Sequence, residues 1–306
     1  MRECRDAGMR GCREDTAVSD ERLTPRSMLI TGASSGFGLL AARLALARGW
    51  RVAAAARRPI PLDPSADLLP LGLDVTDGAA VSRAVQEVIE IFGTLDAVVN
   101  NAGMANFGTA EEVPMEALRR EIETNFFGAV AVTRAVLPHM RARHSGHLVF
   151  VSSDWGRTGI PGFSGYCASK HALEGWAESL YHEVRPFGIG VILIEPGAFD
   201  TGFTSAPAAA ALDPSSPYAA LYHAIGQGFD EEGQTPTGEP VAEAILRAAS
   251  GEDPRLRVAV GADAMEWSSA RFKDSEQEFI RTLARKYGWD QPGAGSRELK
   301  NRSTNL

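Results

Sequence analysis

Short runs of apolar residues alternate with longer amphipathic stretches from Ser27 onward, and this order predicts a chain of strands and helices. The short runs are almost wholly apolar, without the alternating polar positions of a half-exposed sheet. Strands of this kind are buried on both faces, as in a parallel sheet covered by helices. The predicted strands are residues 28–30, 52–56, 71–75, 97–99, 148–151, 191–194 and 256–260.

The segments between these runs carry apolar residues at helical spacing. Helices are expected at 37–48, 79–92, 115–143 and 241–249, and in a segment that carries Tyr166 and ends near Arg185. Strands that alternate with helices indicate an α/β fold with a doubly wound parallel sheet, the Rossmann fold. The Ala-, Pro- and Gly-rich residues 199–239 are predicted to form a substrate loop on this single domain.

Composition narrows the possible functions. The chain has 306 residues, 44% of them hydrophobic, and a formal net charge of −8. The acidic balance and the lack of a basic cluster argue against nucleic-acid binding. No apolar stretch approaches the roughly 20 residues of a membrane-spanning helix, so no membrane partner is expected. Cys4, Cys12 and Cys167 lack ligand-like spacing, which indicates reduced thiols in a cytoplasmic protein. A Cys4–Cys12 disulfide is the less favoured alternative.

The two ends of the chain differ from its centre. Residues 1–27 are rich in Arg, Asp and Glu and are expected to form a disordered extension, followed by a catalytic domain at 28–262. A helical segment and polar tail are expected at 263–306. Deleting residues 1–26 should leave cofactor binding intact.

The spacing of His139, His144 and His147 does not match a metal motif, so no metal site is expected.

A glycine-rich turn, Thr31-Gly32-Ala33-Ser34-Ser35-Gly36-Phe37-Gly38, follows the first predicted strand and opens the first predicted helix. Gly32 suits a tight turn, and Gly36 and Gly38 allow a pyrophosphate and the helix to approach closely. A helix N-terminus favours phosphate, so this context predicts a dinucleotide site. The alternative is a glycine-rich loop without a function.

Tyr166 and Lys170 lie four positions apart, so a helix places both on one face. A free tyrosine has a pKa of about 10 and is a poor base near neutral pH. Lowering that pKa by about 3 units takes roughly 4 kcal/mol. An ammonium about 6 Å away supplies roughly 2.8 kcal/mol at an effective dielectric constant near 20. Lys170 is therefore expected to lower the pKa of Tyr166 only in part.

Together with Asn101-Ala102-Gly103 and with Ser153, thirteen positions before Tyr166, these motifs resemble the short-chain dehydrogenase/reductase family over about residues 28–262. The resemblance implies an oxidoreductase that transfers hydride between a nicotinamide and a carbonyl/alcohol pair. It implies catalytic roles for Asn125, Ser153, Tyr166 and Lys170, with Tyr166 as general acid/base. The rest of the tyrosine's activation is expected to come from the positive charge of oxidised nicotinamide and from hydrogen bonds. By the resemblance, Asn125 helps a water connect Lys170 to solvent.

The resemblance also implies which residues bind the cofactor. They are Gly32, Ser34, Ser35, Gly36, Phe37, Gly38, Arg57, Arg58, Asp74, Val75, Asn101, Ala102, Gly103, Tyr166, Lys170, Pro196, Gly197, Phe199 and Thr201. Where NAD-binding members have an acidic residue, this chain has Ala56, followed by Arg57 and Arg58, so NADP(H) is the expected cofactor. Alternatively, both arginines are solvated charges at a strand end. Asp74 could instead cap the turn that follows it.

The substrate side of the predicted site is apolar. Its expected residues are Met104, Phe107, Trp155, Phe163, Phe199 and Phe203, which suit a hydrophobic ketone, aldehyde or alcohol unless they are general packing. Asp154 has no assigned role. Two of the predicted helices have apolar positions on several faces, and members of the family commonly associate through these helices. Together these features predict a homodimer or homotetramer. The alternative functions are an NADP(H)-binding sensor without turnover, and an epimerase or dehydratase of the extended relatives, whose glycine spacing differs.

Overall fold

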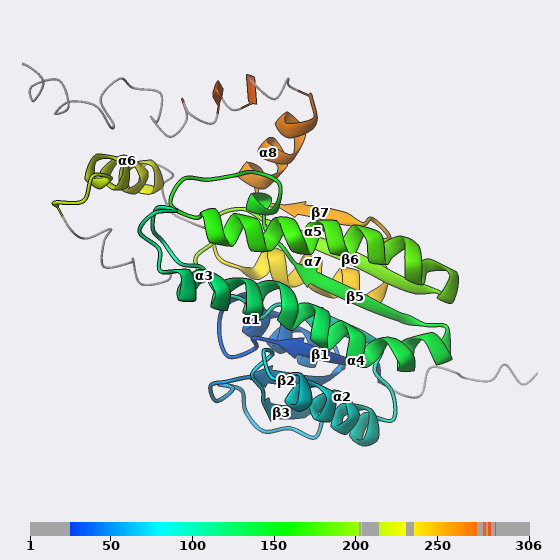
Figure 1. Ribbon diagram of the computed structural model, residues 1–306. Helices are drawn as coiled ribbons and strands as arrows, with labels where there is room; N and C mark the ends of the chain where they lie inside the picture. The colour runs from blue at the N-terminus through cyan, green and yellow to red at the C-terminus, as the bar shows by residue number, and fades with distance from the viewer. Residues whose placement is uncertain are drawn as a thin grey trace, which may run out of the picture.

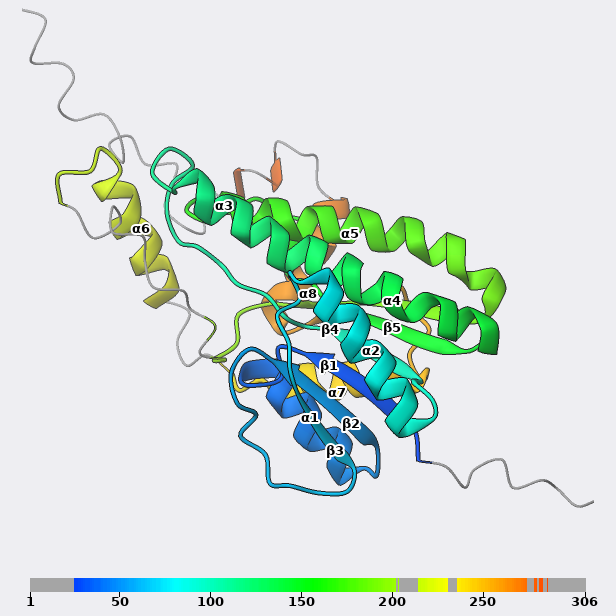
Figure 2. The ribbon, with the colours of Figure 1, turned by 60° about the horizontal axis from the view of Figure 1, so that its bottom comes forward.

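The computed structural model describes residues 25–201, 203, 214–230, 236–273, 278–279, 281–282 and 285. Within them, seven strands form one parallel sheet in the order β3-β2-β1-β4-β5-β6-β7, with helices on both faces (Figures 1 and 2). The chain leaves β1 toward one edge of the sheet and returns to its other side at β4, which makes the β1–β4 boundary a topological switch point. The predicted doubly wound α/β fold is confirmed.

Most strand predictions match the structure within a few residues. The strands are β1 (Ser27–Thr31), β2 (Arg51–Ala56), β3 (Leu68–Gly72), β4 (Ala97–Asn100), β5 (Gly146–Val151), β6 (Ile189–Pro196) and β7 (Arg257–Val260). The strand predicted at 71–75 is wrong by three residues. The observed strand, β3, contains Pro70, which lacks a backbone N–H donor. This proline is tolerated because, among the described strands, β3 pairs with β2 alone and forms the sheet's edge. Asp74 therefore lies in the loop after β3.

The helices also follow the prediction, with one interruption. They are α1 (Gly36–Ala47), α2 (Gly78–Phe92), α3 (Met115–Ile122), α4 (Gly128–Arg143), α5 (Ser164–Val184), α6 (Ala219–Asp230), α7 (Glu239–Ser250) and α8 (Ala262–Lys273). A π-helical turn, η1 (Glu123–Phe127), separates α3 from α4, so the continuous helix predicted at 115–143 is wrong. Such turns are frequent at functional sites, and η1 carries Asn125. Two short 3₁₀ turns, η2 (Asp154–Gly156) and η3 (Arg185–Phe187), flank α5.

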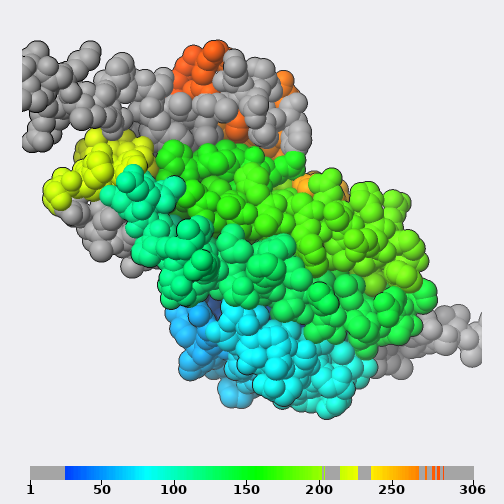
Figure 3. Space-filling view, in the orientation of Figure 1, coloured from blue at the N-terminus to red at the C-terminus, as the bar shows by residue number. Residues whose placement is uncertain are grey.

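Two apolar layers enclose the sheet. Leu29 of β1 packs in the layer beneath α2, α4 and α5, whereas Met28 and Ile30 pack in the layer beneath α1 and α7. Successive strand side chains point to opposite faces, so covering both faces requires apolar residues at every position. This packing explains the continuous apolar runs in the sequence. Figure 3 shows α4 and α5 (green) beside α2 (cyan) on one outer face.

Parts of several predictions fall outside the described residues. These parts are residues 1–24 of the expected N-terminal extension, with Cys4 and Cys12, most of the tail beyond 273, and residues 202, 204–213 and 231–235 of the expected substrate loop. The described part of that loop contains α6, a helix that was not predicted.

No described helix combines the length and apolarity needed to cross a membrane. The described residues also contain no group of three or more side chains suited to hold a metal ion.

Candidate active site

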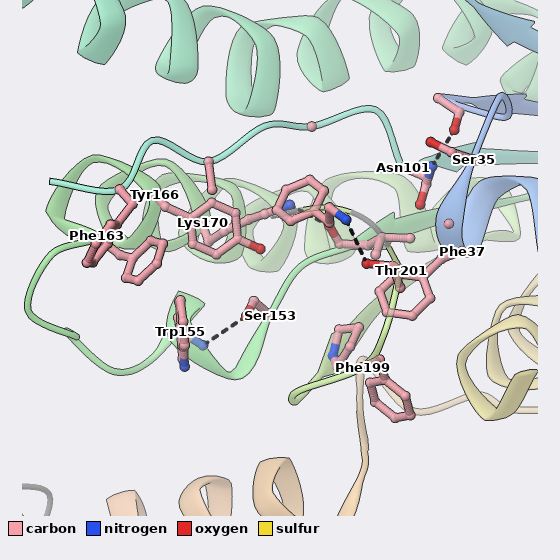
Figure 4. Close-up of a pocket in the computed structure, with 18 of the residues that line it drawn as sticks. Ser35, Phe37, Asn101, Ser153, Trp155, Phe163, Tyr166, Lys170, Phe199 and Thr201 are labelled. Atoms are coloured by element: carbon pink, nitrogen blue, oxygen red, sulfur yellow. Dashed lines mark hydrogen bonds between the residues drawn. The ribbon is translucent and has the colours of Figure 1, made fainter. Parts of the chain in front are cut away.

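A cavity of about 1600 Å³ opens at the carboxyl ends of the central strands. Its lining includes the residues that directly follow the six strands β1 to β6, which are Gly32, Arg57, Leu73, Asn101, Ser152 and Gly197. Ligands of open α/β sheets bind at this edge, beside the switch point. Figure 4 shows side chains running from Ser35 and Asn101 at one end of the pocket, past Tyr166 and Lys170, to Trp155 and Phe163.

The glycine turn is shaped by close backbone packing. Gly32 has a φ of 68°, and a Cβ on it would lie 2.8 Å from Ala102 Cα. A Cβ on Gly38 would lie 2.4 Å from Asn101 Nδ2, the amide that donates hydrogen bonds to the carbonyl oxygens of Thr31 (2.9 Å) and Gly32 (3.2 Å). Gly38 thus permits the packing without lining the cavity itself. The turn leaves the N-terminus of α1 open to the cavity, which fits a nucleotide pyrophosphate.

Two arginines extend this end of the cavity. Arg57 and Arg58 follow β2 and are exposed, and both line the cavity. Arg58 Nη2 donates hydrogen bonds to Ser35 Oγ (2.9 Å) and Ser34 Oγ (3.3 Å) in the glycine turn. Arg58 is therefore attached to the turn instead of being a free solvated charge. This donor set fits a phosphate ester beside the turn.

Asp74 has the capping role that the sequence left open. Its Oδ1 accepts hydrogen bonds from Thr76 N (3.0 Å) and Thr76 Oγ1 (2.8 Å). The backbone bond from Thr76 is the main reason that the pKa of the Asp74 carboxyl is lowered. Asp74 and Val75 also line the cavity, so capping and cofactor contact are compatible.

The loop after β6 closes the cavity from the other side. Pro196, Gly197, Phe199 and Thr201 all line it. Phe199 packs edge-on against Phe37 of α1, with 5.8 Å between ring centroids (Figure 4). Asp263 of α8, a residue the sequence did not indicate, accepts a hydrogen bond from Ala198 N at 2.7 Å and holds this loop.

Tyr166 and Lys170 lie on one face of α5, as predicted, and both line the cavity. Lys170 Nζ lies 5.6 Å from the Tyr166 ring centroid and donates a hydrogen bond to Val151 O at 2.7 Å. Burial lowers the pKa of Lys170 to about 8, against the opposing effect of Glu174 and Glu121. Burial raises the pKa of Tyr166 above its ordinary value, although a hydrogen bond with Ser153 acts the other way. The lowering of its pKa expected from Lys170 and from oxidised nicotinamide stays a prediction.

Ser153 and Asp154 form a linked pair at the start of η2. Ser153 Oγ donates a hydrogen bond to Asp154 Oδ1 at 2.9 Å and accepts one from Trp155 N at 3.2 Å. Both residues are buried and line the cavity. Burial raises the pKa of the Asp154 carboxyl to about 7, and the nearby charges of Asp263 and Glu195 add to the rise.

Asn125 does not line the cavity. Its Oδ1 accepts from Met104 N (2.8 Å), and its Nδ2 donates to Met104 O (2.8 Å) and to Ser169 Oγ (2.9 Å). The side chain therefore ties the loop after β4 to α5, directly behind Lys170. Met104, expected to face the substrate, is held by these bonds and does not line the cavity either.

The end of the cavity away from the glycine turn is aromatic, and α6 adds residues that the sequence did not indicate. Phe107, Trp155, Phe163 and Phe203 line the cavity there. From α6 come Tyr222 and Ile225, both buried, and the exposed His223. Tyr222 OH accepts a hydrogen bond from Thr109 N at 2.8 Å and donates one to Glu112 Oε2, which fixes α6 over the cavity.

Comparisons with known proteins identify the family of this chain. A family profile described as short chain dehydrogenase matches residues 26–210. The chain is 36% identical over 247 residues to oxidoreductase BOA17 of Botryotinia fuckeliana, which covers 78% of this chain and 90% of that protein. It is 42% identical over 182 residues to a 3-ketodihydrosphingosine reductase of Bacteroides thetaiotaomicron, which covers 60% of this chain and 67% of that protein.

Solved structures agree in fold. A short-chain dehydrogenase from Streptomyces avermitilis is 35% identical with a TM-score of 0.74, covering 87% of this chain and 97% of that one. A short chain dehydrogenase from Burkholderia cenocepacia in complex with NADP is 25% identical with a TM-score of 0.68, covering 85% and 98%. A 3-ketoacyl-(acyl-carrier-protein) reductase from Brucella melitensis complexed with NADH is 24% identical with a TM-score of 0.66, covering 78% and 98%, and it shows the fold alone.

Proposed function

The chain belongs to the short-chain dehydrogenase family, and from this premise we propose that it is an NADP(H)-dependent oxidoreductase acting on a carbonyl/alcohol pair of a lipophilic small molecule. One observation carries the proposal. The hydroxyls of Ser153 and Tyr166 and the ammonium of Lys170 share one cavity with the glycine turn. A sensor without turnover would need the turn alone.

Reduction requires a hydride and a proton. When bound, the reduced nicotinamide supplies the hydride to the carbonyl carbon. Ser153 Oγ holds the carbonyl oxygen by a hydrogen bond once its hydroxyl proton turns from Asp154 Oδ1 to the substrate, and the Tyr166 phenol donates its proton to that oxygen. At its ordinary pKa of about 10 the phenol is already protonated at neutral pH, so it can donate this proton. The resulting phenolate is stabilised by the Lys170 ammonium on the same helix face.

Lys170 and Asn125 have supporting roles in this proposal. Lys170 binds the cofactor's ribose hydroxyls, and its bond to Val151 O keeps the ammonium at the end of β5. Asn125 acts as a positioning residue through its bonds to Met104 and Ser169. The water relay implied for Asn125 would run through its backbone, since its side-chain amide is already committed to these partners.

NADP(H) is favoured over NAD(H) by the residues after β2. Ala56 carries no carboxylate to repel a 2′-phosphate, and Arg57 and Arg58 line that end of the cavity. A charge-assisted hydrogen bond to such a phosphate contributes roughly 1.5–3 kcal/mol, or about ten- to more than a hundredfold in affinity. The NADP in the Burkholderia structure supports the same preference.

A lipophilic substrate fits the other end of the cavity. The rings of Phe107 and Phe163 pack with 5.1 Å between centroids, and Trp155 packs against Phe163 at 4.9 Å. A cavity walled in this way binds apolar groups and discriminates against strongly hydrated ones. The Bacteroides relative is named as a 3-ketodihydrosphingosine reductase, and that name supports a lipophilic keto substrate for this chain.

A homodimer or homotetramer stays part of the proposal. The apolar residues of α5 that suggested it, including Leu173, Ala177 and Leu180, pack into the chain's own core. Phe127, directly before α4, is 50% exposed and is a candidate contact. Light scattering of the purified chain measures the assembly. The cytoplasmic location expected from the cysteines stays a prediction.

The proposal is tested by following NADPH oxidation with a panel of lipophilic ketones and aldehydes. Tyr166→Phe is the matched variant, since it keeps the ring contacts with Trp155 (6.0 Å) and Phe203 (5.9 Å) and loses only the hydroxyl. Turnover by the wild type, with a loss of at least about a hundredfold in Tyr166→Phe and unchanged NADPH binding, is expected. NADPH binding without turnover on any ketone or aldehyde would count against the proposal and favour a sensor.

A further inference from the structure

The proposed mechanism leaves Asp154 without a function. The residue lines the cavity, yet it is only 8% exposed. Oδ1 accepts hydrogen bonds from Ser153 Oγ and Trp155 N, each at 2.9 Å. Oδ2 accepts no hydrogen bond and forms no ion pair with any residue of the described parts of the chain. Half of this buried carboxylate is thus available to a ligand.

The local contacts of Asp154 do not require a charge. Both bonds end on one oxygen, so an asparagine would satisfy Ser153 and Trp155 equally well. A buried carboxylate without a cation is costly, and the acidic neighbours Asp263 and Glu195 increase that cost. A positive group on a ligand would offset it.

The surroundings also favour a cation at this end of the cavity. Among the described lining residues, the basic side chains are Arg57 and Arg58 beside the glycine turn, Lys170 beneath Tyr166, and the exposed His223 on α6. In the part of the chain that the structure describes, no arginine or lysine forms an ion pair with Asp154. Trp155, adjacent to Asp154, offers an aromatic face, which attracts ammonium groups, whereas an anionic substrate would be repelled.

We propose that Asp154 binds a protonated amino group of the substrate, so that the chain acts on an amino ketone or amino alcohol with an apolar tail. Ser153 Oγ, which holds the carbonyl oxygen in the proposed function on which this inference rests, lies 2.9 Å from Asp154 Oδ1. Because these two groups are adjacent, an amino group one or two carbons from the carbonyl carbon can reach the carboxylate while the carbonyl oxygen meets Ser153 Oγ. The aromatic wall of Phe107, Phe163 and Tyr222 receives the tail.

The test compares three medium-chain ketones that differ only beside the carbonyl: an α-amino ketone, its N-acetyl derivative, and the ketone with hydrogen in place of the amine. The wild type is expected to show a kcat/KM for the amino ketone about ten- to a hundredfold above that for the other two. Asp154→Asn, which keeps the Oδ1 acceptor, should bring that ratio close to one. Asp200→Asn removes an exposed carboxylate from the same cavity and should leave the ratio at the wild-type value.

Equal kcat/KM values for the three ketones in the wild type would overturn the inference, as would a preference that survives in Asp154→Asn. If Asp154→Asn fails to fold, the N-acetyl comparison in the wild type decides alone. If no ketone is reduced, the proposed function fails for this substrate class. The inference is then tested separately by calorimetry, which compares the binding of the medium-chain amino alcohol with that of the amine-free alcohol. Tighter wild-type binding of the medium-chain amino alcohol than of the amine-free alcohol, by tenfold or more, supports it, and equal or absent binding overturns it.

Discussion

The Lys170 ammonium lies 5.6 Å from the centre of the Tyr166 ring and is bonded at 2.7 Å to the carbonyl oxygen of Val151, the last residue of β5. The bond joins α5 to the carboxyl end of the sheet, where the cavity opens. Its donor is a buried charge, and burial lowers the pKa of Lys170 to about 8. A buried ammonium with a lowered pKa lowers the stability of the fold, which is typical of groups retained for function.

Lys170→Met should therefore separate activity from stability. Methionine fills a similar volume without a charge, so the desolvation cost disappears while the Val151 carbonyl loses its donor. We expect a melting temperature within a few degrees of the wild type, together with a loss of about a hundredfold or more in kcat/KM and weaker NADPH binding. Steady-state kinetics, NADPH titration and a thermal melt measure the three quantities.

Lys273→Met is the matched control, because Lys273 ends α8 and its side chain is exposed. It should leave all three quantities near their wild-type values. Wild-type kinetics in Lys170→Met would remove Lys170 from the proposed mechanism.

Arg58 should contribute more to the cofactor preference than Arg57. Arg58 Nη2 is already held by Ser34 and Ser35, so less conformational entropy is lost when it meets a 2′-phosphate. Arg58→Ala is expected to weaken NADPH binding about ten- to a hundredfold and NADH binding by less than about threefold. Arg57→Ala should show a smaller loss of the same kind.

Fluorescence titration of both cofactors with each variant measures this preference. A parallel loss of NADPH and NADH affinity in Arg58→Ala would show that the arginine only supports the glycine turn.

The fold was predictable because its physical causes are local. Continuous apolar runs revealed strands buried on both faces. Apolar residues at helical spacing predicted α1, and glycine marked where that helix ends. The β3 prediction failed because Pro70 interrupts the run, and only the pairing of β3 with β2 alone makes a proline acceptable there. The π turn at Asn125 was invisible because a helical repeat does not reveal one extra residue.

The candidate site was predictable where a motif fixes geometry. The glycine turn and the Tyr166–Lys170 spacing give positions directly, and the structure brings both to one cavity. Tyr222 and Asp263 were missed because their approach depends on the packing of α6 and α8, far along the chain. The burial of Asp154 was equally hidden, since sequence neighbours do not reveal which carboxylate lacks a cation.

Gly38 should be intolerant of alanine. A Cβ there would lie 2.4 Å from Asn101 Nδ2 and 2.6 Å from the Gly32 carbonyl oxygen, so the glycine turn must shift. Gly38→Ala is expected to weaken NADPH binding by at least tenfold and to lower the melting temperature by several degrees, corresponding to about 1–3 kcal/mol.

Gly175→Ala makes the same chemical change at an exposed position inside α5, where a Cβ meets nothing within 4 Å. It should raise stability by about 0.5–1 kcal/mol and leave NADPH affinity unchanged. The two melts and titrations are measured side by side. A tolerated alanine at Gly38 would contradict the close packing of the turn on Asn101.

Asp154 should make the wild type less stable as the pH rises. Burial raises its pKa from 3.8 to about 7, so between these values the folded chain keeps a proton that the unfolded chain has released. Its contribution to stability is therefore complete below about pH 4 and is lost as the pH rises through about 7. Asp154→Asn has no such titration, so its stability relative to the wild type should increase between pH 4 and pH 8, by a few kcal/mol at most.

Asp96 provides a control of opposite sign. Although burial opposes it, hydrogen bonds from Ser27 and Arg143 lower the pKa of the Asp96 carboxyl. Its contribution to stability is present above pH 4 and is lost as the pH falls. Asp96→Asn should therefore be destabilised most at neutral pH and least near pH 3, the reverse of the trend for Asp154→Asn.

Denaturant melts of the wild type, Asp154→Asn and Asp96→Asn between about pH 3 and pH 8 test both trends. A pH-independent difference between Asp154→Asn and the wild type would show that Asp154 titrates alike in the folded and unfolded chains, and would contradict the desolvation that its burial implies.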